Sequence, residues 1–269
     1  MDGFEVLDKL NNEELGVLVN LIVDKGFVSE FLSTDESYQK YYPDHKMYVD
    51  KIKEELSTMG GNTMANTFRT IFTDGPAGIS YREMLMDVCD KLKIGYDSND
   101  DDESIENYLL ASVLNEGWED MSSEQQAIFL GTVKDDNIPM EINKFSWFVR
   151  IFKFGGFESY KLSVIVANSV SKIILGKGLS FATNAALTKG LSVLVGPVAA
   201  VLSAFWTVQS FAGPAYRVTI PAVVYIAAMR KVKEHDNPSL KTVLGTAALG
   251  LGILALGKLF GGDDRDKQD

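Results

Sequence analysis

The sequence has few of the side chains on which most metal centres and nucleophilic enzymes rely. It contains one cysteine, Cys89, and two histidines, His45 and His235, which lie in different halves of the chain. A single cysteine cannot form an intramolecular disulfide, and neither histidine has a cysteine or carboxylate at the spacing of a zinc site. We therefore expect no metal and no histidine-based catalysis. Because its neighbours are polar, His45 is interpreted as an exposed loop residue.

Patterns that approach known ligand motifs are incomplete. Residues 97–101 match the first oxygen positions of an EF-hand loop, but Asp102 replaces the required glycine and Tyr108 the required glutamate. Residues 176–178 lack the rest of a P-loop, and the glycines within 250–255 follow no predicted strand. Adjacent carboxylate pairs give no reason for a shifted pKa. We expect no cofactor, no catalytic residue and no enzymatic activity.

Alternation of polar and apolar residues, which marks a half-buried strand, is almost absent. Apolar positions instead recur at helical spacing between Phe4 and Leu10, and again after Asn11, which forms a predicted capping box with Glu14. Further helices are predicted over residues 48–59, 80–92, 104–115 and 122–131. The predicted fold class is all-α, with an N-terminal helical bundle followed by an apolar Gly/Ala-rich helical hairpin region.

Charge is distributed unevenly along the chain. Residues 1–150 carry 30 acidic and 13 basic side chains, a net of −17, whereas residues 151–269 carry 7 acidic and 13 basic ones, a net of +6. The acidic half would be repelled by nucleic acid, and the basic half lacks aromatic residues interleaved for base stacking, so we expect no nucleic-acid partner. Cations set among apolar runs instead favour an anionic membrane surface.

The expected partners are therefore membrane lipids, together with a protein partner at the acidic N-terminal domain. Homo-oligomerisation is left open. The first residues lack the basic region and the long apolar region of a secretory signal. We expect a location on the cytoplasmic face of the inner membrane, or in the cytoplasm with membrane association.

The longest uncharged run covers residues 190–216, and its 27 residues are enough for a helix to cross a hydrocarbon core of roughly 30 Å. Gly196-Pro197 and Gly213-Pro214 each favour a turn followed by a new helix. A helical hairpin or re-entrant segment is therefore predicted in place of one straight span. A second apolar helix, 218–229, ends in basic residues expected on the cytoplasmic side, and 242–257 is a third candidate segment.

Two features of this region indicate membrane contact. Gly196, Ala200 and Ala204 recur four residues apart, a pattern that lets helices approach closely in lipid. Arg217 lies in an apolar stretch, where an arginine is costly unless it is paired or faces a cavity, so it is a functional candidate; a role in capping a helix junction is the alternative. For the whole region, the alternative to membrane contact is a tightly packed core. The candidate membrane-contact residues are Gly196, Pro197, Ala200, Ala204, Trp206, Gly213, Pro214, Tyr216, Arg217, Pro221, Arg230 and Lys231.

Changes in composition predict four segments, with the main boundary in the polar loop 132–143. They are a short N-terminal helical domain (1–35), an acidic helical domain (36–143), an apolar basic helical region with a hairpin (144–233), and a Gly-rich apolar C-terminal segment with a polar tail (234–269).

The block Gly-Pro-Ala-Tyr-Arg-Val-Thr-Ile-Pro-Ala at 213–222, followed by Arg230-Lys231, resembles the signature of the YaaW-like uncharacterised bacterial family. Blocks at 54–66 and 81–93 are similar to the central domain of that family. The resemblance covers about residues 4–30 and 50–232, and the chain departs from the pattern after about residue 238. It implies no catalytic residues. The family is distantly grouped with ubiquinol-cytochrome c chaperones, which are helical assembly factors.

Two functions are consistent with these features. The first is a non-enzymatic, membrane-associated accessory or chaperone-like protein with a cytoplasmic acidic helical domain. The alternative is a membrane-inserting, pore-forming or permeabilising effector whose glycine-alanine hairpin enters the bilayer.

Overall fold

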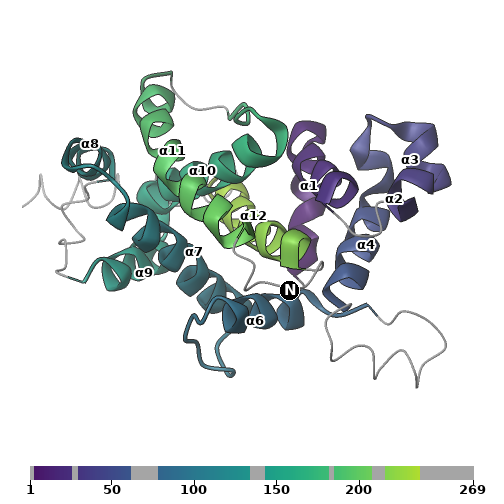
Figure 1. Cartoon of the computed structure of the whole chain (residues 1–269), viewed down its shortest axis with the longest axis horizontal. Helices are drawn as coiled ribbons and strands as arrows, with labels where there is room; N and C mark the ends of the chain where they lie inside the picture. Colours follow the sequence, from purple (N-terminus) through teal and green to yellow (C-terminus); the bar gives the residue numbers. More distant parts are fainter. Residues whose placement is uncertain are drawn as a thin grey trace, which may run out of the picture.

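The structure is a computed structural model that describes residues 3–25, 30–61, 78–133, 143–181, 185–207 and 216–236. All regular secondary structure in these ranges is helical, which confirms the predicted all-α class. The α-helices, arranged as in Figure 1, are α1 (Asn12–Lys25), α2 (Glu30–Thr34), α3 (Glu36–Tyr41), α4 (Val49–Gly61), α6 (Tyr81–Lys91), α7 (Asp102–Glu119), α8 (Ser123–Val133), α9 (Lys144–Phe154), α10 (Gly156–Leu175), α11 (Ala185–Thr207) and α12 (Tyr216–Asp236). Two 3-10 helices, η1 (Gly3–Lys9) and η2 (His45–Tyr48), complete the set.

Helix starts follow the capping residues that the sequence predicts. At α1, the amide of Glu14 donates to Asn11 Oδ1 at 2.9 Å and the amide of Asn11 donates to Glu14 Oε2 at 2.8 Å. Reciprocal caps of the same kind open α6 and α8. Helix α7 begins earlier than predicted, because Asp101 accepts from the amide of Ser104 at 2.8 Å and its charge suits a helix N-terminus.

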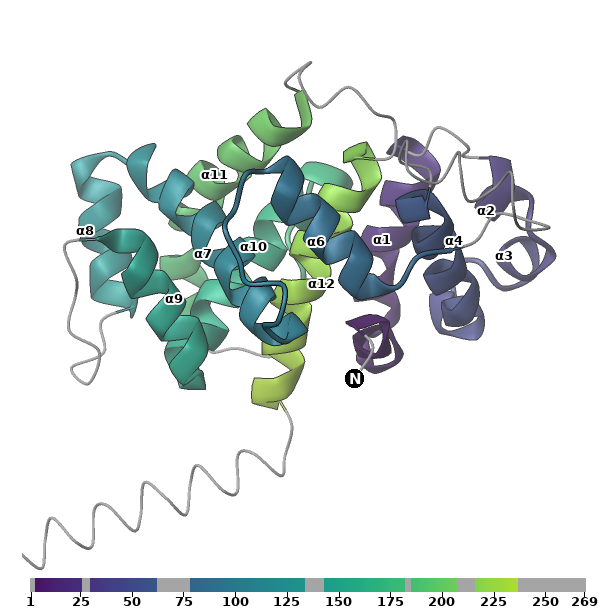
Figure 2. The same cartoon turned by 90° about the horizontal axis from the view of Figure 1, so that it is seen from below.

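Helix α12 forms the centre of the molecule. Every residue from 218 to 229 is buried, on all sides of the helix. The helix contacts η1, α1, α4, α6, α7, α10 and α11, and both views show it running between α7 and α10 on one side and α1 on the other (Figures 1 and 2). A helix that is apolar all round is buried either in a protein core or in lipid. The segment predicted to face lipid is therefore a core helix, enclosed by its own chain.

Helix α11 continues through Pro197, so the turn predicted at Gly196-Pro197 is wrong. Proline inside a helix removes one backbone hydrogen bond and costs about 3 kcal/mol. On the same helix, Leu194, Val198 and Leu202 are fully buried, and α11 packs against α7, α8 and α10. Burial of side chains of this size contributes about 1.5–3 kcal/mol each, which offsets the cost of the proline. The second predicted break, at Gly213-Pro214, lies outside the described residues.

None of the described helices combines the length and apolar character needed to cross a membrane. The predicted transmembrane helices are thus not found in the described part of the chain, and the candidate segment 242–257 lies outside it. The described helices of residues 3–233 contribute to one continuous apolar core. The four-segment division stays a prediction.

Candidate membrane-contact surface

The arginine at the C-terminal end of α12 pairs inside the protein. The Nε atom of Arg230 donates to Glu106 Oε2 at 2.8 Å and to Glu106 Oε1 at 3.1 Å, and Glu106, on α7, is fully buried. The hydroxyl of Tyr81, on α6, donates to Glu106 Oε1 at 2.6 Å, and the Arg230 guanidinium lies 5.7 Å from the centre of the Tyr81 ring. Arg230, predicted to flank a membrane segment, instead neutralises a buried carboxylate.

Burial dominates the titration of this cluster. It raises the pKa of Glu106, against the opposing charge of Arg230. It also raises the pKa of Tyr81 well above its usual value, and the charge of Glu106 acts in the same direction. Burial alone would lower the pKa of Arg230, but the charge of Glu106 makes the net shift upward. Each group therefore depends on its partners, as expected for a buried ion pair that holds helices together.

Two lysines tie α12 to other helices in the same way. Lys231 Nζ donates to Glu103 Oε1, on α7, at 2.5 Å. Lys233 Nζ donates to Glu14 Oε1, on α1, at 2.7 Å, and the hydroxyl of Tyr225 donates to the backbone oxygen of Glu14 at 2.9 Å. Lys231, like Arg230, thus serves the fold and is not presented toward headgroups.

The N-terminal end of α12 differs from the predicted hairpin junction. The hydroxyl of Tyr216 donates to Asp87 Oδ1 at 3.1 Å, and Lys91 Nζ lies 4.7 Å from the centre of the Tyr216 ring. Burial raises the pKa of Tyr216 to about 12 and also raises the pKa of Asp87. Arg217 is exposed, because the buried part of α12 begins at the next residue. The expectation of a buried arginine at this junction is therefore wrong.

The other candidates from the sequence do not form one surface. Gly196, Ala200 and Ala204 are exposed on α11, Pro197 is half-buried on α11, and Pro221 is buried inside α12. A Cβ atom added to Gly196 would meet nothing within 4 Å, so this glycine serves no close helix contact among the described residues. The side chain of Trp206, together with Gly213 and Pro214, lies outside the described residues.

An exposed aromatic corner joins α9 to α10. Helix α9 buries one face against α7 and contains three basic residues but no acidic one. Gly155 and Gly156 have φ angles of 69° and 74°, which side chains with a Cβ rarely adopt, so they turn the chain sharply at this point. Phe154 and Phe157 flank the turn and remain 67% and 49% exposed.

Cations surround the two phenylalanines. The Arg150 guanidinium lies 5.9 Å from the centre of the Phe154 ring, and Lys161 Nζ lies 5.0 Å from the centre of the Phe157 ring. Lys153 is exposed beside Phe154. We refer to Arg150, Lys153, Phe154 and Phe157 as the corner surface. It combines exposed apolar rings with positive charge, the combination that binds the interface of an anionic bilayer.

The one acidic residue in the first turn of α10 does not leave a free negative charge beside the rings. Glu158 forms an ion pair with Lys161, whose ammonium also donates to the backbone oxygen of Thr132. Glu158 therefore adds no unpaired negative charge beside the corner surface. Among the described residues, the other exposed large hydrophobic side chains are Tyr42 and Met47, which lie further apart in sequence than Phe154 and Phe157.

The sequence-based search missed the corner surface because it looked for long uncharged runs. The available signal was local: the sequence Lys-Phe-Gly-Gly-Phe at 153–157 places two aromatic residues around a glycine pair at the end of a basic helix. A glycine pair between two helical patterns predicts a turn, and large side chains at a turn are harder to bury. That pattern would have pointed to an exposed aromatic pair.

His45 is buried, with 5% of its surface exposed, and the prediction of an exposed loop residue is wrong. Its Nδ1 atom lies 2.5 Å from the hydroxyl oxygen of Tyr48, and the rings of Tyr42 and Tyr48 pack edge-on against it. Burial lowers the pKa of His45. The neighbours in sequence did not reveal this burial because His45 also packs against α1, where its Nε2 atom would lie 3.3 Å from a Cβ atom on Gly16.

Among the described residues, no cluster of three or more His, Cys, Asp or Glu side chains could hold a metal ion. The acidic loop that resembles part of an EF-hand uses its carboxylates internally. Asp97 accepts from the backbone and side-chain amides of Asn99 at 2.9 Å, and Asp101 caps α7.

Comparison with known proteins identifies relatives that cover most of the chain. A UPF0174 protein of Helicobacter pylori strain J99 is 38% identical over 218 residues, which are 80% of this chain and 83% of the relative. A second UPF0174 protein of the same strain is 36% identical over 210 residues, or 76% of this chain and 98% of the relative. The UPF0174 protein YaaW of Escherichia coli K12 is 28% identical over 197 residues, covering 73% and 77%.

No family model matches the chain, and no solved structure matches it. The names of the relatives state no activity, and the distant grouping with ubiquinol-cytochrome c chaperones stays a prediction. Identity of 38% across more than four-fifths of a relative is nevertheless enough to show that the two chains belong to one family. The resemblance seen in the sequence blocks is therefore confirmed at the family level, and the chain belongs to the UPF0174 family.

Proposed function

We propose that this protein is a non-enzymatic accessory protein that docks reversibly on the cytoplasmic surface of an anionic membrane through the corner surface. The observation that carries the proposal is the exposure of Phe154 and Phe157 beside Arg150 and Lys153 on a tight glycine turn. Aromatic rings enter the boundary between headgroups and acyl chains, while neighbouring cations are attracted to anionic headgroups.

The strength of this contact follows from its parts. Each cation held at an anionic surface contributes about 1 kcal/mol, and full burial of one phenylalanine contributes about 1.5–3 kcal/mol. Because both rings are already partly covered, the total is on the order of a few kcal/mol. One myristoyl chain likewise gives only marginal, reversible anchoring. The proposed contact is therefore peripheral, reversible and sensitive to salt.

The acidic N-terminal part supplies the proposed contact with a protein partner. Asp50 and Glu54 on α4 are 93% and 66% exposed but pair with Lys53 and Lys51, so the negative charge of this part is the excess of acidic over basic residues, a net of −17 over residues 1–150. Negative charge there would be repelled by the same membrane that attracts the corner surface. This polarity supports an orientation in which the acidic part faces away from the bilayer and remains open to a partner. The chaperone-like aspect of the proposal rests on the family resemblance alone.

Vesicle sedimentation tests the docking surface. Wild-type protein is expected to sediment with phosphatidylglycerol vesicles at low salt, to be released by high salt, and to stay in solution with phosphatidylcholine vesicles. The double variant Phe154→Ser, Phe157→Ser should lose most of this binding. Met47→Ser is the matched control, since Met47 is 56% exposed on η2, which packs beside α3 and α4 and away from α9. Equal loss in the control and the double variant would overturn the proposal.

Dye leakage separates the accessory role from the permeabilising effector. A protein that binds through a shallow corner should leave phosphatidylglycerol vesicles intact at concentrations where it sediments fully with them. Leakage that rises in step with binding would instead support the effector and contradict the accessory role. The double variant shows whether any leakage depends on the corner surface.

A further inference from the structure

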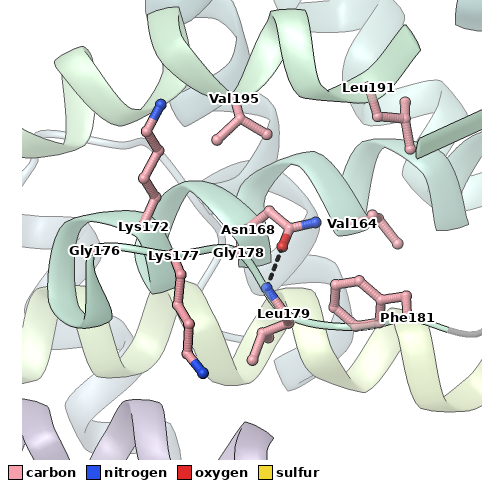
Figure 3. Close-up of a pocket in the computed structure, with 10 residues that line it drawn as sticks. All are labelled: Val164, Asn168, Lys172, Gly176, Lys177, Gly178, Leu179, Phe181, Leu191 and Val195. Atoms are coloured by element: carbon pink, nitrogen blue, oxygen red, sulfur yellow. Dashed lines mark hydrogen bonds between the residues drawn. The ribbon is translucent and has the colours of Figure 1, made fainter. Parts of the chain in front are cut away.

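A cavity of about 350 Å³ lies between the C-terminal half of α10, the turn that follows it and α11. Its walls are mostly apolar: Val164 comes from α10, Leu179 and Phe181 from the segment after the turn, and Leu191 and Val195 from α11 (Figure 3). This volume lies within the range of small-ligand pockets, which are typically apolar with a few placed polar groups.

The turn beside the cavity is held in a fixed shape. Gly176 ends α10 with a φ of 72°, and the amide of Leu179 donates to Asn168 Oδ1 at 2.7 Å, the bond drawn in Figure 3. The hydroxyl of Ser171 donates to the backbone oxygen of Lys177 at 2.8 Å. A Cβ atom on Gly178 would lie 2.8 Å from Asn168 Oδ1, so a larger residue here would have to displace the Asn168 side chain that holds Leu179. The cavity is therefore preformed on this side.

Positive charge lies at the polar end of the cavity. Lys172 and Lys177 both contribute to its lining and are exposed, and Figure 3 shows their side chains extending in opposite directions from the turn. Lys177 Nζ is 4.0 Å from Glu13 Oε1, a long contact between side chains that are 68% and 34% exposed. The described residues that line the cavity include no acidic side chain. The other oxygen of Glu13, Oε2, accepts from the amide of Ser180 at 3.4 Å, so an anionic group at the turn would have to displace Glu13 from Lys177 but not from Lys172.

We propose that this cavity binds one alkyl chain that ends in an anionic head, with the chain against Leu191 and Val195 and the head at the turn that carries Lys172 and Lys177. A free fatty acid and a single-chain anionic phospholipid share this chemistry. The site is separate from the corner surface, because the two lie at opposite ends of α10, whose 20 residues span roughly 30 Å. The inference therefore does not rest on the proposed docking function.

Calorimetric titration of the full chain tests the site with monomeric laurate and with lysophosphatidylglycerol carrying the same chain. Binding of either supports the proposal, and the tighter of the two identifies the source. Decanoate should bind laurate's site on the order of tenfold more weakly, because each methylene in an apolar site changes affinity by about fourfold. Dodecyltrimethylammonium, which has a cationic head, should not bind. Equal binding of the cationic and anionic probes, or binding of no anionic probe, would overturn the proposal.

Two variants locate the site. Val195→Phe should fill the cavity, and Lys172→Glu with Lys177→Glu should repel the head; each is expected to weaken laurate binding at least tenfold. The charge-reversal variant changes only exposed side chains, so it remains informative if the filled cavity destabilises the fold. Lys153→Glu on the corner surface is the control: it should reduce sedimentation with vesicles and leave laurate binding unchanged. Unaltered laurate binding in both cavity variants would contradict the assignment.

Discussion

At the scale of single residues, Glu106 shows how strongly one buried carboxylate depends on its partner. It is fully buried and accepts hydrogen bonds from Arg230 and Tyr81. Replacing it with leucine leaves the charge of Arg230 unpaired in the interior, which should lower the free energy of unfolding by about 3–5 kcal/mol. Urea denaturation followed by circular dichroism measures this change.

A partly exposed pair provides the control for Glu106→Leu. Arg82 Nη1 donates to Asp102 Oδ1 at 2.6 Å, with 35% and 21% of the two side chains exposed. Asp102→Asn should cost about 1 kcal/mol or less. Adding Arg230→Met to Glu106→Leu should recover much of the lost stability, since removing both charges leaves no unpaired ion. Equal costs for Glu106→Leu and Asp102→Asn would refute a structural role for the buried pair.

His45 gives the fold a dependence on pH. Burial lowers the pKa of its imidazole below the usual 6.5, so the unfolded chain takes up a proton first as the pH falls. The stability contributed by neutral His45 is therefore present above about pH 6.5 and is lost as the pH falls below that value, with a slope of at most ~1.4 kcal/mol per pH unit for one proton. In protonated His45 the Nδ1 atom is a donor only, so the Tyr48 hydroxyl must then accept in this contact.

The test compares wild-type protein with His45→Gln by urea denaturation at about pH 7.5 and pH 5.5, on either side of the usual histidine pKa. The wild type should lose more stability between the two conditions than the variant does. Carboxylates such as Glu106, whose pKa burial raises, affect both proteins alike and cancel in the comparison. Parallel losses in the two proteins would show that His45 does not titrate as its burial implies.

At the scale of helices, the sequence predicted where a helix begins better than it predicted whether that helix lies in lipid or in a protein core. Capping residues act within one turn, so the capping box of Asn11 with Glu14 could be predicted from a local pattern, and it is present. The environment of a helix depends on contacts with residues that are distant in sequence. The apolar stretch 218–229 is equally suited to lipid and to a core, and only the packing of seven other elements around α12 decides between them.

The turn predicted at Gly196-Pro197 was wrong for a related reason. The pair Gly196-Pro197 is a strong local signal for a turn, but α11 runs through it because its apolar residues pack against α7, α8, α10 and α12. Local preference is worth a few kcal/mol at most, and a buried helix face outweighs it. The corner surface went unseen because its two phenylalanines belong to separate helices and meet only through the geometry of the Gly155-Gly156 turn.

Close packing of α7 on α11 predicts opposite effects for two glycine substitutions. A Cβ atom on Gly117, in α7, would lie 3.1 Å from Val198 Cγ2 and 3.5 Å from Val198 Cα, on α11. Gly117→Ala should therefore lower the free energy of unfolding by about 1–3 kcal/mol, because the Val198 side chain must give way inside a packed helix contact. Gly131, exposed in α8 with nothing within 4 Å of its Cβ position, is the matched control.

Gly131→Ala should stabilise the protein by about 0.5–1 kcal/mol, since alanine loses less backbone entropy in a helix and meets no neighbour. Thermal or urea denaturation of the two variants measures both signs in one experiment. Stabilisation by Gly117→Ala would mean that α7 and α11 separate easily, and that the close approach seen at Val198 is not required by the fold.

At the scale of the whole molecule, the two halves differ in charge but share one interior. Three carboxylates of the acidic half form ion pairs with three cations of the basic half, all on α12. The pairs are Glu14 with Lys233, Glu103 with Lys231, and Glu106 with Arg230. The charge asymmetry that suggested a membrane-facing half is thus partly used to join the halves to each other. What is left for an external anionic surface is the positive charge outside these three ion pairs, including that of Lys153 on the corner surface.

Because α12 lies at the centre, the chain before it should not fold independently. Burial of the large side chains between 218 and 229 contributes roughly 10–20 kcal/mol, as much as the entire net stability of a typical domain. A chain ending at residue 207 would also leave Glu14 and Glu106 without their partners on α12. We therefore expect a chain of residues 1–207 to lack near-ultraviolet circular dichroism and a cooperative urea transition.

The matched comparison is a chain ending at residue 236, which keeps α12 and all three of its ion pairs with α1 and α7. It should unfold cooperatively, because every element that contacts α12 is present on both sides of the core. A cooperative transition in the shorter chain would show that the acidic half has a sufficient core of its own and that α12 docks on it as a separable element. The same result would revive a releasable apolar helix, and with it the permeabilising function, since α12 could then leave the protein without unfolding the rest.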